Sequence, residues 1–111
     1  MDLADAMVAD GGDPPATIRV DGGMAANDWL CQFLADMLQV AVERPQHLET
    51  TALGAAFHAG LATGVWADLD ALAATWVRGD CFEPKMDAES RATLAAGWHA
   101  ALAKTLTGTG R

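Results

Sequence analysis

A pair of glycines in the stretch Asp21-Gly22-Gly23 stands between a short β-branched run and a helical pattern. Glycines at such a turn let the backbone bend tightly, and they let a ligand approach without meeting a β-carbon. The first N–H groups of the helix that follows carry a partial positive charge, which favours anions such as phosphate. We place Asn27 in the first turn of that helix, where its side-chain amide could point toward the same ligand.

The same glycines also fit a turn that needs them only for its shape. The stretch is neither the dinucleotide-binding G-x-G-x-x-G motif nor a Walker A motif, because no lysine follows the glycines. An aspartate before two glycines, as Asp21 is here, is ordinary in turns. The residues alone therefore leave both an anion site and a purely structural turn open.

The other groups that could do chemistry are scattered along the chain. His47, His58 and His99 have no metal-ligand spacing among themselves or with the cysteines. Cys31 and Cys81 lie in different segments, so we predict free thiols in a reducing compartment, with a disulfide between them as the open alternative. No grouping of a nucleophile with a base supports a catalytic assignment, and we assign no catalytic residue and no metal ligand.

The elements that must position the glycine turn are a strand, a helix and a second strand. Residues 17–20 are short and rich in β-branched side chains, which predicts a strand before the turn. Residues 40–42 predict a second strand, stopped by Arg44-Pro45. Strand, helix and strand in this order form a βαβ unit, whose strands are parallel. The helix between them has apolar residues at the spacing of one buried stripe, at Ala26, Leu30, Phe33, Leu34, Met37 and Leu38.

Residues 50–63 predict a further helix, with Thr50 or Thr51 as its N-cap and Gly64 as its C-cap. Small residues recur on one ridge of this helix, at four-residue spacing. Since they leave no bulk between backbones, we expect the helix to lie very close to a neighbour. The ridge consists of Ala52, Ala56 and Gly60, with Ala55 and Ala59 beside it.

Three more elements complete the pattern. Residues 2–10 predict a short amphipathic helix, and 68–75 predict another that Asp68 caps. Residues 78–82 are extended and form a third strand if they pair. Asp87 caps a final helix, after which 107–111 form a frayed tail. The inward face of that helix is predicted at Leu94, Trp98, Ala101, Leu102 and Thr105.

Two or three strands are too few for a self-sufficient parallel sheet. Parallel strands are normally buried on both faces inside a larger sheet. We therefore predict a helix-rich α/β chain in which residues 1–111 are a single partial domain. Such a piece would expose an apolar edge unless another polypeptide completes it.

The composition is globular and acidic, with 51% hydrophobic residues and a formal net charge of -8. Fifteen acidic residues face seven basic ones, and the basic ones form no stripe. Phosphate backbones and anionic membranes would repel such a chain, so we expect neither a nucleic-acid nor a membrane partner. We see no signal peptide and no membrane-spanning run, and the expected location is the cytoplasm.

Two stretches carry a specific resemblance. IRVDGGMAANDWLCQFLADML at 18–38 and VERPQHLETTALGAAFHAGLATGVW at 42–66 closely resemble the C-terminal domain of the glycerol kinases of the FGGY carbohydrate kinase family. The elements at 43–45 and 49–56 resemble glycerol kinases rather than the pentulose or gluconate kinases of that family. The resemblance continues more loosely through Phe82 and the final helix, and so covers nearly the whole chain.

The resemblance implies an actin-like, ribonuclease-H-like ATPase fold, of which this chain is the distal half of the C-terminal domain. It implies that 22–27 is the adenosine motif, with nucleotide-binding residues Gly22, Gly23 and Asn27, and that 50–64 is a helix connecting two domains. The implied reaction transfers the γ-phosphoryl group of ATP, bound with Mg²⁺, to glycerol, giving glycerol 3-phosphate. The family's phosphate loops and catalytic aspartate lie upstream of the residues present, so the isolated chain is expected to be inactive.

The implied partners are ATP or ADP, the missing N-terminal kinase portion, and further copies in a homo-oligomer. Two alternatives stay open. One is a non-catalytic dimerisation module derived from such a kinase. The other is a fragment of a kinase that acts on another polyol or sugar.

Overall fold

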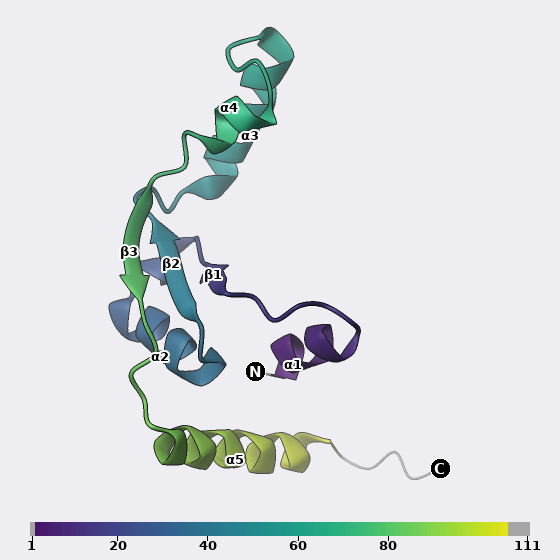
Figure 1. Ribbon diagram of the computed structural model, residues 1–111, viewed down its shortest axis with the longest axis vertical. Helices are drawn as coiled ribbons and strands as arrows, with labels where there is room; N and C mark the ends of the chain where they lie inside the picture. The colour runs from purple at the N-terminus through teal and green to yellow at the C-terminus, as the bar shows by residue number, and fades with distance from the viewer. Residues whose placement is uncertain (1, 107–111) are drawn as a thin grey trace.

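The computed structural model describes residues 2–106, and the predicted frayed tail at 107–111 lies outside them. Residues 2–106 form six helical segments and three strands (Figure 1). They are α1 (Asp2–Ala9), β1 (Thr17–Arg19), the 3₁₀ helix η1 (Gly23–Ala26), α2 (Asp28–Leu38), β2 (Ala41–Pro45), α3 (Thr50–Thr63), α4 (Leu69–Ala73), β3 (Arg78–Phe82) and α5 (Ala88–Thr105).

The strands form one sheet in the order β1-β2-β3. β1 and β2 are parallel, with Ile18 opposite Val42, and α2 is the crossover between them, so the predicted βαβ unit is confirmed. β3 pairs antiparallel to β2, with Phe82 opposite Val42. The third strand, which was predicted on the condition that 78–82 pair, is therefore confirmed. β2 runs on to Pro45, past its predicted end, and the pairing register with β3 shifts between Glu43 and Pro45. Proline is tolerated there because irregular strand positions do not need its missing N–H.

The core is a small cluster between α2 and the sheet. Cys31 and Ala35 of α2 and Val42 of β2 are buried. The predicted buried stripe on α2 was therefore wrong. Its six residues are only partly buried or exposed, and the buried residues Cys31 and Ala35 each follow a predicted one by one position. The reason is steric, because two small residues one turn apart let α2 approach the strand closely, while the larger ones pack at the sides. The partly buried apolar residues against this cluster are Ile18, Val20, Leu34 and Phe82.

α3 ends as predicted but begins differently. Gly64 adopts a left-handed conformation at φ 77° and caps the C-terminus through its N–H. The N-cap is Glu49, without a side-chain hydrogen bond, so the prediction of Thr50 or Thr51 was wrong. The hydroxyl of Thr50 is used elsewhere, since it donates to Asp21. The short helix α4 is capped by Asp68 as predicted, through its bond from the N–H of Ala71.

The small-residue ridge of α3 has one close neighbour within the chain. Gly60 is buried under the indole of Trp66, which also makes an edge-to-face contact with Phe57 at 5.3 Å between ring centroids. The neighbouring alanines at 52, 55, 56 and 59 are exposed. Within the part of the chain that the structure describes, the expected close packing is therefore confirmed at Gly60 and not at the alanines.

Gly60→Ala is expected to lower the free energy of unfolding by about 1–3 kcal/mol, because its β-carbon would overlap the Trp66 ring and force it away from Phe57. Thermal unfolding measures the loss. Gly54→Ala is the matched control in the same helix, because its β-carbon would meet nothing within 4 Å. That control should gain stability by about 0.5–1 kcal/mol from helix propensity, and equal effects of the two substitutions would contradict the packing.

The described residues leave much apolar surface exposed. The predicted inward face of α5 was wrong within this chain, since Leu94 is 44% and Trp98 is 54% exposed. The radius of gyration is 18.3 Å, against about 13 Å for a compact domain of this length. α3 and α4 lie at one end of the long axis and α5 at the other (Figure 1). Apolar surface is exposed on helices and a loop, rather than along a strand edge as predicted, and it includes Leu3, Met7, Met24, Trp29, Val65 and Leu69.

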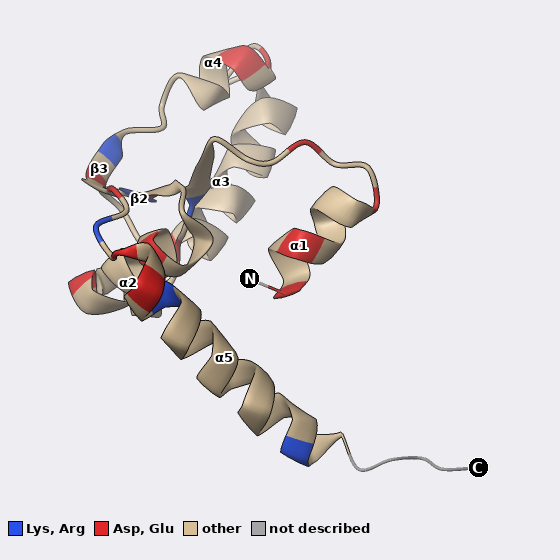
Figure 2. Ribbon diagram, turned by 60° about the horizontal axis from the view of Figure 1, so that its bottom comes forward, with Lys and Arg blue, Asp and Glu red and all other residues tan. Residues whose placement is uncertain are grey.

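Charges are distributed as the composition suggested. Acidic residues colour α1, α2 and α4, whereas basic residues are single and separate (Figure 2). Within residues 2–106 no helix is both long enough and apolar enough to span a membrane.

Candidate functional site

The glycine turn lies directly after β1, at the end of the parallel pair. Gly22 has φ 82° and ψ 174°, a backbone conformation that is essentially restricted to glycine. Its N–H donates to the carbonyl of Leu48 at 3.1 Å, and its carbonyl accepts from the N–H of Ala25 at 3.0 Å. Gly22 thus reverses the chain after the strand and starts η1.

Gly23 has a different role from its neighbour. Its φ is not positive, so the backbone here would accept any residue. A β-carbon at this position would meet no atom within 4 Å. Met24, which follows it, is 66% exposed. The backbone at Gly23 therefore borders open space, where a ligand could come close.

Asn27 is the N-cap of α2, and its predicted place in the first helical turn was wrong. A short 3₁₀ helix intervenes, so α2 begins only at Asp28. The side-chain oxygen of Asn27 accepts from the N–H of Leu30 at 3.1 Å. This bond fixes the orientation of the amide group, and its Nδ2 makes no hydrogen bond to any other residue in the range 2–106. Asn27 keeps two donors for a ligand while it caps the helix.

Asp21 joins the turn to α3. Its carboxylate accepts a 2.6 Å hydrogen bond from the hydroxyl of Thr50, the first residue of that helix. Together with the bond from Gly22 to Leu48, this contact fastens the turn to the segment between β2 and α3. Asp21 is therefore engaged in a tertiary hydrogen bond with a residue 29 positions away, rather than in the local turn bond that was predicted.

Arg44 is the residue of this region that sequence reasoning missed. It lies in β2, and its guanidinium contacts Ala25, Asp28 and Asp80, on three different elements. The hydrogen bond to Asp80 is the main cause of the raised pKa of Arg44, and the bond to Asp28 adds to it. The sequence signal was weak, because the partners are 16 to 36 positions away and only the arginine itself stands out beside Pro45.

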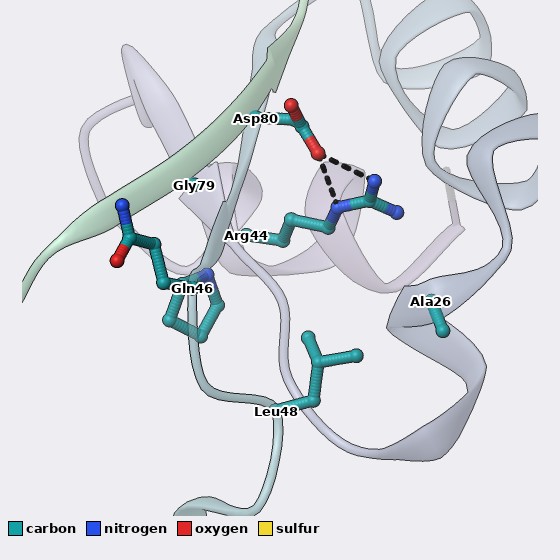
Figure 3. Close-up of a pocket in the computed structure, with 7 residues that line it drawn as sticks. Ala26, Arg44, Gln46, Leu48, Gly79 and Asp80 are labelled. Atoms are coloured by element: carbon teal, nitrogen blue, oxygen red, sulfur yellow. Dashed lines mark hydrogen bonds and ion pairs between the residues drawn. The ribbon is translucent and has the colours of Figure 1, made fainter.

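A pocket of about 470 Å³ lies between η1 and the β2–β3 pair, and its lining among the described residues does not include Gly22, Gly23 or Asn27. Figure 3 shows the guanidinium of Arg44 bonded to Asp80, with Ala26 of η1 across from them. The lining is mostly polar, which suits a hydrated or polar ligand more than an apolar one. Its residues are Ala26, Arg44, Pro45, Gln46, Leu48, Gly79 and Asp80.

The remaining candidates do not assemble into a second site. Cys31 is buried and Cys81 is exposed, and both are free thiols, as predicted. Partial desolvation of the sulfur, with the Glu83 carboxylate beside it, raises the pKa of Cys81 and so disfavours its thiolate. His99 lies 3.2 Å from Asp2 on the surface. Within residues 2–106 no three histidine, cysteine or acidic side chains converge on a possible metal position.

The sequence matches the model of the FGGY family of carbohydrate kinases, C-terminal domain, over residues 1–63. It is similar to a glycerol kinase of Gluconobacter oxydans, with 53% identity over 96% of this chain and 21% of the relative. A glycerol kinase of Rhodospirillum rubrum is 58% identical over 87% of this chain and 20% of its own length. The chain thus spans about a fifth of the length of the curated relatives it matches.

Solved structures of carbohydrate kinases match the fold of this chain. The crystal structure of Plasmodium falciparum glycerol kinase with ADP matches with a TM-score of 0.74 and 31% identity, over 96% of this chain and 21% of that one. A ligand-bound xylulose kinase of Lactobacillus acidophilus matches the fold with a TM-score of 0.71 at 21% identity. The expected fold class, a helix-rich α/β part of an actin-like ATPase fold, is confirmed. The chain belongs to the FGGY family of carbohydrate kinases.

Proposed function

We propose that this chain is the distal half of the C-terminal domain of a glycerol kinase, and that it forms one wall of the ATP site. The intact enzyme would transfer the γ-phosphoryl group of ATP to glycerol, giving glycerol 3-phosphate, in the cytoplasm. The observation that carries the proposal is the open Gly23 backbone next to the capping Asn27, in a chain 31% identical to a glycerol kinase solved with ADP.

The residues of the turn fit a nucleotide in two ways. Gly23 offers backbone that a planar or polar group can approach without steric hindrance. Asn27 offers an amide with two donors on a side chain that the bond to Leu30 already orients. A preoriented donor loses little conformational entropy when a ligand binds, and so contributes more affinity than a free side chain.

The residues do not fit Mg²⁺. Asp21, the carboxylate nearest the glycines in sequence, is bonded to Thr50, and no cluster of possible ligands exists in residues 2–106. In this proposal the metal, the base that takes the hydroxyl proton and the contacts to glycerol belong to the larger polypeptide portion that the relatives carry in addition. The chain binds and orients the nucleotide, and does no bond chemistry itself.

The isolated chain is expected to show no transfer of phosphate from ATP to glycerol, because in this proposal the metal and the base belong to the portion that the relatives carry in addition. The intact kinase, in which the chain is joined to the remaining portion, is expected to produce glycerol 3-phosphate in a coupled ADP-release assay. A panel of polyols and sugars, with glycerol as reference, tests the acceptor. Turnover by the chain alone, or a clear preference of the intact enzyme for another acceptor, would contradict the proposal.

A further inference from the structure

Arg44 of β2 contacts three residues, two in the segment around Asn27 and one in β3. Its Nη1 donates to the carbonyl of Ala25 at 2.9 Å and lies 2.8 Å from Oδ1 of Asp28. Its Nε donates to Oδ2 of Asp80 at 2.9 Å, and its Nη2 donates to the same oxygen. Ala25 is in η1, Asp28 begins α2 and Asp80 is in β3.

The bond from Arg44 to the carbonyl of Ala25 is the most sheltered of these contacts. The side chain of Arg44 is 15% exposed, but Asp28 and Asp80 are 74% and 62% exposed, so solvent screens the two ion pairs. Its fork of donors bonds charged and backbone acceptors at once, which a single ammonium group cannot reproduce. Ala25 itself is buried, so its carbonyl needs a partner.

Two of the residues that Arg44 contacts, Ala25 and Asp28, flank Asn27 in the sequence. Ala25 precedes Asn27 by two positions and Asp28 follows it directly. The other bonds of this segment are local, such as Ala25 to Gly22 and Cys31 to the carbonyl of Ala25. Within residues 2–106, Arg44 supplies the polar contacts between the segment 24–28 and the sheet.

We propose that Arg44 is a positioning residue for the nucleotide, holding the segment around Asn27 at a fixed distance from the β2–β3 pair. The inference rests on the proposed function, because it assigns a task within the same site. Arg44 need not touch the nucleotide. Without its guanidinium, Asp28 and Asp80 would lose their shared counter-charge and the segment would move away from the sheet, carrying the amide of Asn27 with it.

The test is a kinetic comparison of Arg44→Met and Arg44→Lys in the intact kinase. Arg44→Met is expected to raise the KM for ATP about tenfold, which corresponds to about 1.4 kcal/mol, and to leave the KM for glycerol unchanged. Arg44→Lys keeps a positive charge but not the fork, and should give a smaller rise. Arg78→Met is the matched control, since it removes an arginine that pairs with Glu43 at 3.1 Å on the same strand pair without contacting the turn.

A second measurement separates this inference from the proposed function. Calorimetry of ADP binding needs no turnover, and hydrogen exchange of the amides at 24–31 reports the anchoring directly. Faster exchange confined to that segment and weaker ADP binding in Arg44→Met support the inference. Unchanged ADP affinity, or equal rises in both KM values with general loss of stability, overturn it. A wild-type enzyme that binds ADP but phosphorylates no polyol overturns the proposed function alone, and one that binds no ADP overturns both.

Discussion

Replacing Gly23 with valine is expected to raise the KM for ATP of the intact kinase by at least about tenfold, while its thermal unfolding stays unchanged. The structure explains both the higher KM and the unchanged stability. A β-carbon on Gly23 meets nothing within 4 Å and the residue has no positive φ, so the fold accepts a side chain there. The same open space is where we place the nucleotide, and two added methyl groups would occupy it.

Gly22→Val is the matched variant, with the same side chain one position earlier. Gly22 holds φ 82° and ψ 174°, so valine would add backbone strain of about 1–3 kcal/mol. This variant should unfold at a lower temperature and also bind nucleotide less tightly, because the whole turn moves. If Gly23→Val leaves the KM for ATP at its wild-type value, the nucleotide does not approach the turn there and the adenosine-motif assignment is wrong.

Local patterns predicted the elements of this fold well. The β-branched run before the turn, the glycine after α3 and the capping aspartates before α4 and α5 depend on neighbours within a few residues. Asp87, for example, caps α5 through the N–H of Ser90, three positions later. Such interactions are visible in a sequence because the chain itself brings the partners together.

The parts that could not be predicted depend on distant partners. η1 shifts the start of α2 to Asp28, and within η1 the carbonyl of Ala25 accepts from Arg44, 19 positions away. The buried stripe of α2 was misplaced because periodicity favours large apolar residues, whereas close approach to the sheet selected Cys31 and Ala35. The face of α5 was misjudged because a periodic pattern indicates only that a face will be covered, without saying by which polypeptide.

Asp36 is a second case of a distant contact, and it holds the segment before α5. This carboxylate is only 8% exposed. Its Oδ1 accepts from the N–H of Lys85 at 2.6 Å, from the N–H of Met86 at 3.1 Å and from Nε2 of Gln32 at 3.1 Å. A single buried oxygen thus fastens the β3–α5 connection to α2. Arg91 of α5 adds a second link, donating from Nε to the carbonyl of Met37 at 2.8 Å.

Asp36→Ala is expected to lower the free energy of unfolding by about 2–3 kcal/mol, since it leaves the N–H groups of Lys85 and Met86 without their charged acceptor. Asp36→Asn is the control, because its amide oxygen can still accept but carries no charge, and it should lose about half as much. Denaturant unfolding measures both. Hydrogen exchange should show the larger effect at 85–91, and a uniform effect along the chain would contradict this local role.

The same bonds make the contribution of Asp36 depend on pH. The backbone bond from Lys85 is the largest cause that lowers the pKa of this carboxyl below its ordinary 3.8, with bonds from Met86 and Gln32 adding to it. The unfolded state then binds the proton first as pH falls, so the stabilisation is fully present above the unfolded pKa and disappears as pH drops through the lower folded value. The difference in stability between wild type and Asp36→Asn should therefore stay constant from pH 7 to about 5 and shrink below 3.8. A difference that persisted below both pKa values would show that the oxygen atom, rather than its charge, holds the segment in place.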